Sequence, residues 1–449
     1  MSLINESNRK WWILAAMGAS LSMVVMDETV IGVALPTIRH DLSMGAVGSH
    51  WVVNAYILLF TCFAATAGKL EDIFHLGKVV IAGSTIFGIA SIGCALAQNG
   101  LMLILSRGLQ GVSGAVLFTV SVAVITAVFP PKERGLAFGI QTAVGGTFIA
   151  LGPMIGGFFT EILSWRWVFL ANLLVIGFVY TIILTSWKPT NQRPTFKYFD
   201  WSGFLLLIGG LGSFMSGLMQ GPQWGWSNPA VISLLVIGFI WLVIFARIET
   251  RKKSPLIDLR LMAIPEFTGP TLLLFHAETL KLSMLIFTAQ YMQVVLGMNA
   301  LAAGFAMLPA VVSMPFTSYI AGKASDRFGP GWLTLIGMII MASAALATGF
   351  LMPFKRYELL VVPLFLWGSS MPAIYVPGRN ALMNAAPSNL AGQAAGVQLT
   401  FQFLGGALAT AVCGALVVIT GDYRSALIAP PLLSIFFVWL AWRTIPRTA

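Results

Sequence analysis

The stretch WWILAAMGASLSMVVMDETVIGVALP (residues 11–36) decides what class of protein this chain is. It is apolar along almost its whole length, and its only charged side chains are Asp27 and Glu28. A helix rises about 1.5 Å per residue, so roughly 20 apolar residues cross the hydrocarbon of a bilayer. The stretch is therefore predicted to be a transmembrane helix that carries two acids inside it.

The rest of the chain repeats this pattern. Of 449 residues, 57% are hydrophobic and 9% are charged, against about 25% charged in soluble domains. A soluble fold is excluded, because polar residues must coat a water-facing surface. The expected fold class is an all-α polytopic membrane protein. Fourteen spans are predicted, near residues 11–36, 50–69, 78–98, 101–129, 136–160, 167–187, 201–220, 229–247, 267–293, 299–321, 332–351, 358–381, 390–420 and 425–443.

The net charge of +10 comes from basic residues in short loops. With fourteen spans, 19 Lys and Arg fall on the side of the two chain ends and five on the other side. The positive-inside rule then places both termini in the cytoplasm. We expect a multi-pass protein of the cell membrane, most simply a bacterial inner membrane, with the lipid bilayer and not nucleic acid as its partner.

No motif for an enzyme or a cofactor stands out. The three cysteines, Cys62, Cys94 and Cys413, lie far apart inside apolar runs and have no zinc-site spacing. Nucleotide-binding loops and metalloprotease motifs are missing from any credible loop context. We expect no enzyme activity, no cofactor and no metal, so that any transport must draw on an ion gradient.

A repeat indicates internal duplication. GKLEDIF (68–74) and GKASDRF (322–328) share the pattern GKxxDxF, 254 residues apart. Each closes the second span of a predicted six-helix bundle, as in duplicated transporters; chance reuse of small and charged residues in tight loops is the alternative. The predicted organisation is an N-terminal six-helix bundle (1–187), two extra transmembrane helices with cytoplasmic linkers (188–266) and a C-terminal six-helix bundle (267–449).

Several longer motifs carry a family resemblance. They are MDETVIGVALPTIRHDL (26–42), LSRGLQGVSGA (105–115) and GGTFIALGPMIGGFF (145–159), followed by WRWVFLAN (165–172). With them, the chain resembles the major facilitator superfamily, in particular its fourteen-helix drug:proton antiporter branch of the EmrB and QacA type. The resemblance implies alternating access between two six-helix bundles, with the first and fourth helices as neighbours.

The resemblance also marks residues that control opening and closing. The second-to-third loop departs from the family pattern GxLaDRxGRK, because Ile73, His75 and Leu76 replace Arg, Gly and Arg; Lys78 is the substitute cation. The glycines and the proline of the fifth span also have a simple structural role. Small residues allow helices to pack closely, and Gly152 with Pro153 can kink the helix. The predicted gating residues are Gly68, Asp72, Lys78, Gly152, Pro153, Gly156, Gly157, Gly322, Asp326 and Arg327.

Two ionisable residues are predicted to share one depth in the membrane. Asp27 lies 15 residues after Trp12, roughly 22 Å from the cytoplasmic edge. Arg107 lies on a span that descends from the outside, roughly 9 Å from the outer edge. Because charges at this depth are costly and tend to be functional, we interpret Asp27 as the proton-coupling carboxylate and Arg107 as the cation that tunes it. A static ion pair is the alternative.

A second charged pair is expected near the midplane. Glu278 and Lys281 are one helical turn apart on the same face. Glu278 is interpreted as a second proton site or a site for cationic substrate, with a self-satisfied pair as the alternative; Glu28 is left open between cavity and neighbouring helix. The residues predicted to line a substrate cavity are Glu28, Asn54, Tyr56, Gln110, Lys281, Gln290 and Gln398.

These observations predict a proton-coupled secondary transporter that exports small amphipathic compounds. Its partners would be a small-molecule substrate, protons and lipid, and accessory export proteins are left open. A dedicated metabolite or siderophore exporter, or an uptake symporter of the same fold, is the alternative. A non-transporting membrane sensor is remote, because the chain has no stretch long enough for a soluble output domain.

Overall fold

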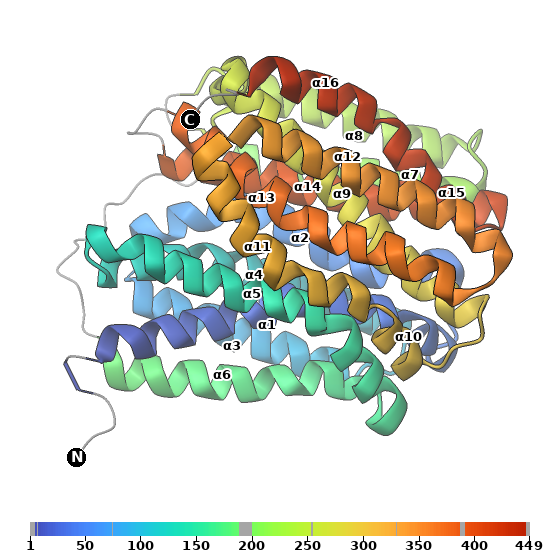
Figure 1. The fold of residues 1–449 in the computed structure, drawn as a ribbon, viewed down its shortest axis with the longest axis horizontal. Coiled ribbons are helices and arrows are strands. Elements are labelled where there is room, and N and C mark those ends of the chain that lie inside the picture. Colours follow the sequence, from blue (N-terminus) through green and yellow to red (C-terminus); the bar gives the residue numbers. More distant parts are fainter. Residues whose placement is uncertain are drawn as a thin grey trace.

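Long helices that run side by side make up the computed structural model (Figure 1). The structure describes residues 5–6, 8–73, 75–187, 200–252, 255–328, 330–386 and 391–445, and within them it contains helices and turns but no strand. The first helix begins and the last helix ends at the same end of the molecule (Figure 1). We call this end the termini face and the opposite end the far face.

The helices fall into three groups along the chain. The N-terminal half contains α1 (Arg9–Asp41), α2 (Ala46–Ile73), α3 (Leu76–Ala95), α4 (Gly100–Val128), α5 (Pro131–Phe158), the π-helical turn η1 (Phe159–Leu163) and α6 (Arg166–Ser186). A hairpin follows, of α7 (Trp201–Trp224) and α8 (Pro229–Glu249). The C-terminal half contains α9 (Pro265–Val294), α10 (Ala300–Ala306), α11 (Leu308–Phe328), α12 (Pro330–Leu351), α13 (Val361–Ala385), α14 (Ala391–Thr420), α15 (Arg424–Leu432) and α16 (Ser434–Thr444).

Thirteen helical segments of the described chain are long and apolar enough to cross a membrane. They correspond to all the predicted spans except the one near 136–160. That span falls on α5, where the described part contributes the shorter apolar segment Leu151–Leu163. A multi-pass membrane protein of about thirteen spans follows directly, and the count of fourteen depends on α5.

Two of the predicted spans are interrupted, and a third changes its helix type at its end. The predicted span 136–160 ends in η1, and the span 299–321 breaks at Met307 between α10 and α11. The span 425–443 breaks at Leu433 between α15 and α16. Prolines explain the last two breaks: Pro309, and the pair Pro430 and Pro431, lack the N–H that would continue the helix ladder.

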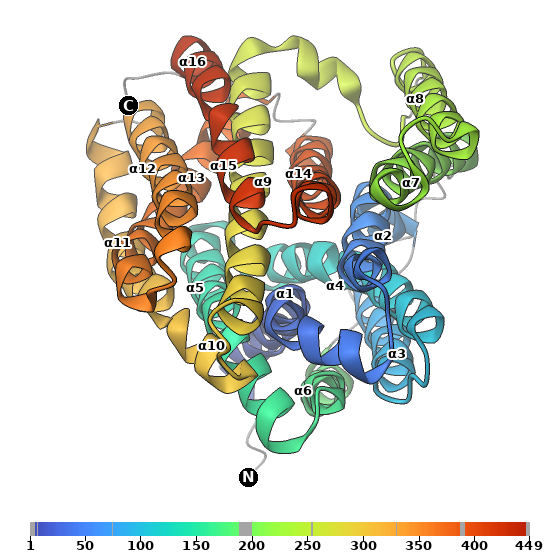
Figure 2. The same ribbon diagram turned by 90° about the vertical axis from the view of Figure 1, so that its right-hand side faces the viewer.

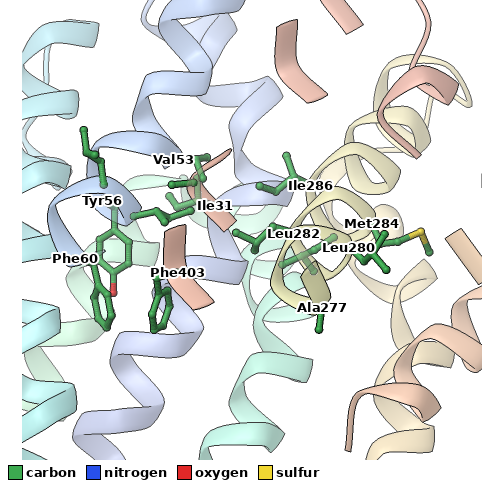
Figure 3. Close-up of a cluster of buried hydrophobic side chains, with 14 of the residues drawn as sticks. Ile31, Val53, Tyr56, Phe60, Ala277, Leu280, Leu282, Met284, Ile286 and Phe403 are labelled. Atoms are coloured by element: carbon green, nitrogen blue, oxygen red, sulfur yellow. The ribbon is translucent and has the colours of Figure 1, made fainter. Parts of the chain in front are cut away.

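The two halves pack against each other along three lines of contact. α2 lies against α14, α1 against α9, and α5 against α10 and α11 (Figure 2). Buried apolar side chains from both halves meet in the centre, among them Ile31 and Phe60 from one half and Leu282 and Phe403 from the other (Figure 3). The rings of Phe60 and Phe403 have centroids 4.3 Å apart. The interface between the halves is therefore part of the hydrophobic core.

The α7–α8 hairpin packs on the outside of α2 and α14 (Figure 2). Glycines hold its two helices close, since a Cβ on Gly238 would lie 2.5 Å from the backbone nitrogen of Phe214. The Phe204 ring of α7 lies 4.8 Å from the Phe63 ring of α2. The hairpin is thus a tightly packed unit that covers one side of the molecule.

Polar contacts at the termini face fix both ends of this hairpin. Asp200 caps α7 by accepting from the Gly203 backbone N–H at 2.8 Å, and it also contacts Lys252. Burial works against ionisation of Asp200, but the hydrogen bonds from Lys252 and Gly203 outweigh it and hold the pKa of this carboxyl well below its usual range. Glu249, at the end of α8, accepts from the Ile257 backbone N–H at 3.0 Å.

Candidate functional site

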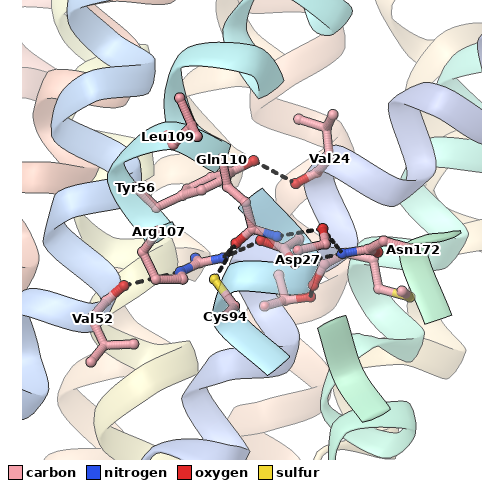
Figure 4. A network of polar contacts seen from close by, with 12 residues as sticks. Val24, Asp27, Val52, Tyr56, Cys94, Arg107, Leu109, Gln110 and Asn172 are labelled. Atoms are coloured by element: carbon pink, nitrogen blue, oxygen red, sulfur yellow. Dashed lines mark hydrogen bonds and ion pairs between the residues drawn. The ribbon is translucent and has the colours of Figure 1, made fainter. Parts of the chain in front are cut away.

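The structure brings Asp27 and Arg107 together as an ion pair in the N-terminal half. Both side chains are 1% exposed. Nη1 of Arg107 contacts Oδ2 of Asp27 and also donates to Oε1 of Gln110 at 2.8 Å (Figure 4). Nε of the same guanidinium donates to the Val52 carbonyl at 3.1 Å. A buried guanidinium is costly unless its donors are occupied, and these contacts occupy Nε and Nη1.

The pair is surrounded by further donors and acceptors. Nδ2 of Asn172 lies 3.2 Å from Oδ1 of Asp27 and 3.3 Å from Oγ of Ser91, and Nε2 of Gln110 donates to the same Ser91 hydroxyl at 2.8 Å (Figure 4). We call Asp27, Ser91, Arg107, Gln110 and Asn172 the Asp27 network. Its members come from α1, α3, α4 and α6, all within one half.

Tyr56 completes the surroundings of this pair from α2. The Arg107 guanidinium lies over its ring at 4.4 Å from the centroid, a cation–π geometry. The Tyr56 hydroxyl donates to the Val24 carbonyl at 2.9 Å (Figure 4). Sequence reasoning missed Ser91 and Asn172 as members of the network; the one available signal was that Asn172 closes the WRWVFLAN motif.

A second set of charges joins the two halves. Nζ of Lys281 contacts Oε1 of Glu278 and lies 3.5 Å from Oε1 of Glu28, which comes from α1. The Tyr375 hydroxyl and the Gln402 side-chain amide donate to Oε2 of Glu278 at 2.7 and 2.8 Å. We call Glu28, Glu278, Lys281, Tyr375 and Gln402 the Lys281 network.

The Lys281 network shows which helix the Glu28 side chain faces and which acids Lys281 contacts. Glu28 faces α9 of the other half, and Lys281 is shared between two carboxylates from different halves. With all three groups ionised, one negative charge is left over. No sequence pattern marked Tyr375 as a member of this network. Gln398, which was predicted to line the cavity, donates to the Gln402 side-chain oxygen at 2.5 Å and so lies next to the network.

The remaining predicted cavity residues lie apart from the two networks. Asn54 contacts the Thr410 hydroxyl of α14, and its amide nitrogen lies 2.9 Å from the Met219 sulfur of α7. Gln290 is buried, and its Nε2 has no hydrogen-bond partner among the described residues. Nε2 of His276, a buried residue of α9, lies 2.7 Å from the Ser434 hydroxyl.

The glycines predicted to act in gating lie where helices touch backbone to backbone. A Cβ on Gly157 would lie 2.4 Å from the Ala300 carbonyl oxygen, and a Cβ on Gly156 would lie 2.6 Å from that of Val30. On α10, a Cβ on Gly304 would lie 2.4 Å from the Pro153 carbonyl oxygen. Here α5 is closely packed against both α1 and α10, in the part of the molecule toward the far face.

The other predicted gating residues are less informative. A Cβ on Gly152 would collide with the Thr29 hydroxyl at 1.9 Å, so this glycine also serves the contact between α5 and α1. Lys78 lies exposed near the start of α3. The surroundings of Gly68, Asp72, Gly322, Asp326 and Arg327 lie outside the described residues.

A small cavity lies between the halves beside the Lys281 network. It measures about 20 Å³, enough for about one water molecule. Helices α5, α9, α11 and α13 and the α10–α11 junction line it. The lining residues are Ile149, Pro153, Lys281, Leu285, Met307, Ala310, Val311, Met314, Trp367 and Met371.

Comparisons with known proteins agree with this architecture. The sequence profile of the Major Facilitator Superfamily matches residues 17–199 and 201–410. The Tetracenomycin C resistance and export protein of Streptomyces glaucescens is 29% identical over 411 residues, which cover 91% of this chain and 76% of that protein. The Multidrug resistance protein Stp of Mycobacterium tuberculosis is 29% identical over 421 residues, which cover 93% of this chain and 77% of that protein.

A solved structure also shares the fold. The crystal structure of a D-xylose-proton symporter superposes with a TM-score of 0.70 at 12% sequence identity, over 97% of this chain and 98% of that one. At this identity the likeness concerns the fold alone. Together, the profile and the relatives indicate a transporter of small molecules rather than an enzyme.

Proposed function

This chain belongs to the Major Facilitator Superfamily, and from that premise we propose that it is a proton-coupled secondary transporter that exports small amphipathic compounds. The names of two relatives, one a resistance and export protein and the other a multidrug resistance protein, support the direction and the class of cargo. The buried Asp27–Arg107 ion pair is the observation that carries the proposed coupling.

Proton coupling needs a carboxylate that is held ionised in one conformation and released in another. Asp27 fits, because its charge is balanced by Arg107 in a site closed to solvent. Release of Asp27 requires α1 and α4 to move relative to each other within the N-terminal half; once the pair is separated, burial favours the protonated acid. Arg107 keeps the cation–π contact with Tyr56 as a second place to rest.

Alternating access is supported by the contacts between the halves. Toward the far face, Gly157 and Gly304 bring α5 and α10 together, and Gln293 donates to the Val33 carbonyl across the halves at 2.8 Å. We take the structure as the conformation closed at the far face. Opening that face has to separate these contacts, and the 3.5 Å approach of Glu28 and Lys281 lies on the same interface.

The proposal extends to topology. We take α5 as the fourteenth crossing, which gives bundles over 1–187 and 267–449 and an extra helical hairpin within 188–266, as in the fourteen-helix branch. The termini face would then be cytoplasmic, in accord with the distribution of Lys and Arg. A dedicated metabolite or siderophore exporter, or an uptake symporter, would use the same fold, and cargo tests must separate them.

The decisive experiment uses everted membrane vesicles with a respiration-driven, acid-inside proton gradient and a pH-sensitive dye. Lipophilic cations and neutral amphipaths are added one at a time. We expect proton leakage that depends on the compound and is lost in Asp27→Asn, while Asp422→Asn, in the loop before α15 where the side chain is 38% exposed, behaves as wild type. Compound-dependent leakage that survives Asp27→Asn would remove Asp27 from the mechanism, and silence across the panel with protein present would favour a dedicated carrier.

A further inference from the structure

The polar cluster that closes the α7–α8 hairpin at the termini face contains two acids and one base. Asp200 precedes α7, Glu249 ends α8 and Lys252 follows it. Nζ of Lys252 contacts Oδ1 of Asp200 and lies 3.5 Å from Oε1 of Glu249. The Asp200 side chain is 6% exposed and the Glu249 side chain is fully buried, so water does little to screen either acid. We call these three residues the hairpin cluster.

The hydrogen-bond donors of the hairpin cluster are unevenly distributed. Oδ1 of Asp200 accepts from the Gly203 backbone N–H at 2.8 Å and from the Ser202 hydroxyl at 3.0 Å, and it also contacts Lys252. Oδ2 of the same carboxylate is buried and has no hydrogen-bond partner among the described residues. A buried acceptor without a donor costs free energy, and more so when it is charged, so a donor for Oδ2 is required.

Glu249 lies where it can supply that donor. A Cβ placed on Gly203 would lie 2.5 Å from Oε1 of Glu249 and 2.8 Å from Oδ2 of Asp200, so the two oxygens flank the same point. The other oxygen of Glu249, Oε2, accepts from the Ile257 backbone N–H at 3.0 Å. Oε1 is therefore the oxygen that faces Asp200, and a proton on it would satisfy Oδ2.

The charges around the two acids favour the same arrangement. Lys252 is the base that pairs with both acids in the described part of the chain, since Asp258 and Arg260 of the following segment pair with each other. Two buried carboxylates side by side cannot both ionise against one cation without a large cost. The three donors on Oδ1 stabilise the ionised form of Asp200, so the proton resides on Glu249.

We infer that Asp200 and Glu249 share one proton and form a pH-responsive latch at the termini face, in which the Glu249 carboxyl donates to Asp200 when the latch is closed. As the pH rises, Glu249 releases this proton to water and the two carboxylates repel each other. Glu249 also holds the Ile257 N–H, in the segment that leads through η2 into α9. Opening therefore frees that segment, and with the proposed topology the latch responds to cytoplasmic pH, whatever the cargo.

Hydrogen–deuterium exchange of the full chain in nanodiscs follows the latch without measuring transport. The Ile257 N–H is the reporter, because it loses its acceptor when Glu249 moves. We expect its exchange, corrected for the intrinsic effect of pH on amides, to accelerate several-fold between pH 6 and pH 9. Corrected exchange that is the same at both values would overturn the latch.

A matched pair of variants separates the proton from the packing. Glu249→Gln preserves the size of the side chain and provides a permanent N–H donor for Asp200, so exchange at Ile257 should stay slow at every pH. Glu266→Gln, at an exposed position at the start of α9, should behave as wild type. If Glu249→Gln kept the pH dependence of the wild type, another group would be titrating and the latch would be wrong.

Infrared spectroscopy detects the shared proton directly. The wild-type minus Glu249→Gln difference spectrum should contain the C=O stretch of a protonated carboxyl at pH 6 and lack it at pH 9. A difference spectrum at pH 6 that contains only carboxylate bands would overturn the inference.

A variant of the base keeps the latch testable if Glu249→Gln does not fold. Lys252 is 26% exposed, so its replacement leaves the core intact. Without the ammonium, the pair should hold its proton to higher pH, and we expect Lys252→Met to move the midpoint of the exchange transition up by about one pH unit. A midpoint that is unchanged or moves down would contradict the shared proton.

Discussion

Asp27 and Glu28 are neighbours on α1, yet they belong to networks that connect different parts of the molecule. Asp27 is bound entirely within the N-terminal half, by Arg107 and Asn172. Glu28, one residue and about 100° further round the helix, reaches across to Lys281 of the C-terminal half. Helix α1 thus carries one charge that is paired within its own half and one that approaches a charge of the other half.

The two networks also differ in how fully their charges are satisfied. Arg107 has an acid, a carbonyl, an amide oxygen and an aromatic face around it. Lys281 has two carboxylates for its single charge, and one of them belongs to the other half. A buried ion pair that is held by several further donors and acceptors fixes one arrangement, whereas a cation shared by two carboxylates allows its partners to be exchanged.

Removal of the cation from the Asp27 network should have the largest effect. Arg107→Leu leaves Asp27 buried without a counter-charge, and we expect a loss of about 3–5 kcal/mol in stability. Thermal unfolding in detergent measures it. The double variant Asp27→Asn with Arg107→Leu should recover most of the loss, because no charge is then buried. A double variant as unstable as Arg107→Leu would show that the arginine acts through packing instead.

Removal of the cation from the Lys281 network should have a smaller effect that depends on pH. Lys281→Met leaves Glu28 and Glu278 facing each other, and we expect a loss of roughly 3 kcal/mol at neutral pH. One of two adjacent carboxylates can take up a proton, so the loss should shrink as the pH falls. Unfolding midpoints of wild type and variant at pH 7.5 and pH 5 check this. A difference that is the same at both values would contradict the like-charge explanation.

Two side-chain amides, those of Asn172 and Gln402, donate to the buried carboxylates of Asp27 and Glu278, and their removal compares the two networks directly. Asn172→Ala removes the second donor to Asp27, for which we expect a loss of about 2 kcal/mol, as for a hydrogen bond to a charged group. Gln402→Ala removes a donor from Glu278, which keeps the Tyr375 hydroxyl at 2.7 Å, so about 1 kcal/mol is expected. Thermal unfolding of the two variants side by side gives the order. The reverse order would contradict the view that the Asp27 network is the more rigid one.

An exposed pair provides the baseline for both networks. Oδ2 of Asp422, in the loop before α15, lies 2.5 Å from Nε of Arg424 at the start of that helix, and both side chains are more than a third exposed. Asp422→Asn should change stability by less than about 1 kcal/mol, because water and salt screen surface pairs. The same unfolding assay measures it. A loss as large as that of Asn172→Ala would mean that burial is not what separates the networks from the surface.

The sequence predicted the position of Asp27 relative to Arg107 because helix rise is constant. Counting residues from the ends of the spans places both side chains at one depth, and the structure brings them into contact. The depth of a residue in the membrane does not define how its helix is rotated about its axis. Residue counting therefore could not tell whether the Glu28 side chain faces a cavity or another helix. Asn172 and Tyr375 depend on which helices are neighbours, which is a property of tertiary packing.

The helix interruptions show a different limit. Proline lies near the breaks at Met307 and Leu433, but Pro36 and Pro153 lie inside continuous helices. In a membrane protein, neighbouring helices can satisfy the carbonyl that a proline leaves free. The sequence alone therefore cannot say which prolines end a helix, and two spans predicted as continuous are in fact interrupted.

The contact of Gly157 and Gly304 with the backbone of the opposite half bears on how the proposed closure at the far face would open. Glycine has no side chain to reorder, so these two residues neither lose nor gain rotamer freedom when α5 and α10 separate. At these two residues the halves touch through backbone atoms and not through interdigitated side chains. If the halves alternate as proposed, an alanine at either glycine would bring its Cβ to 2.4 Å from a carbonyl oxygen of the opposite half and so weaken this closure.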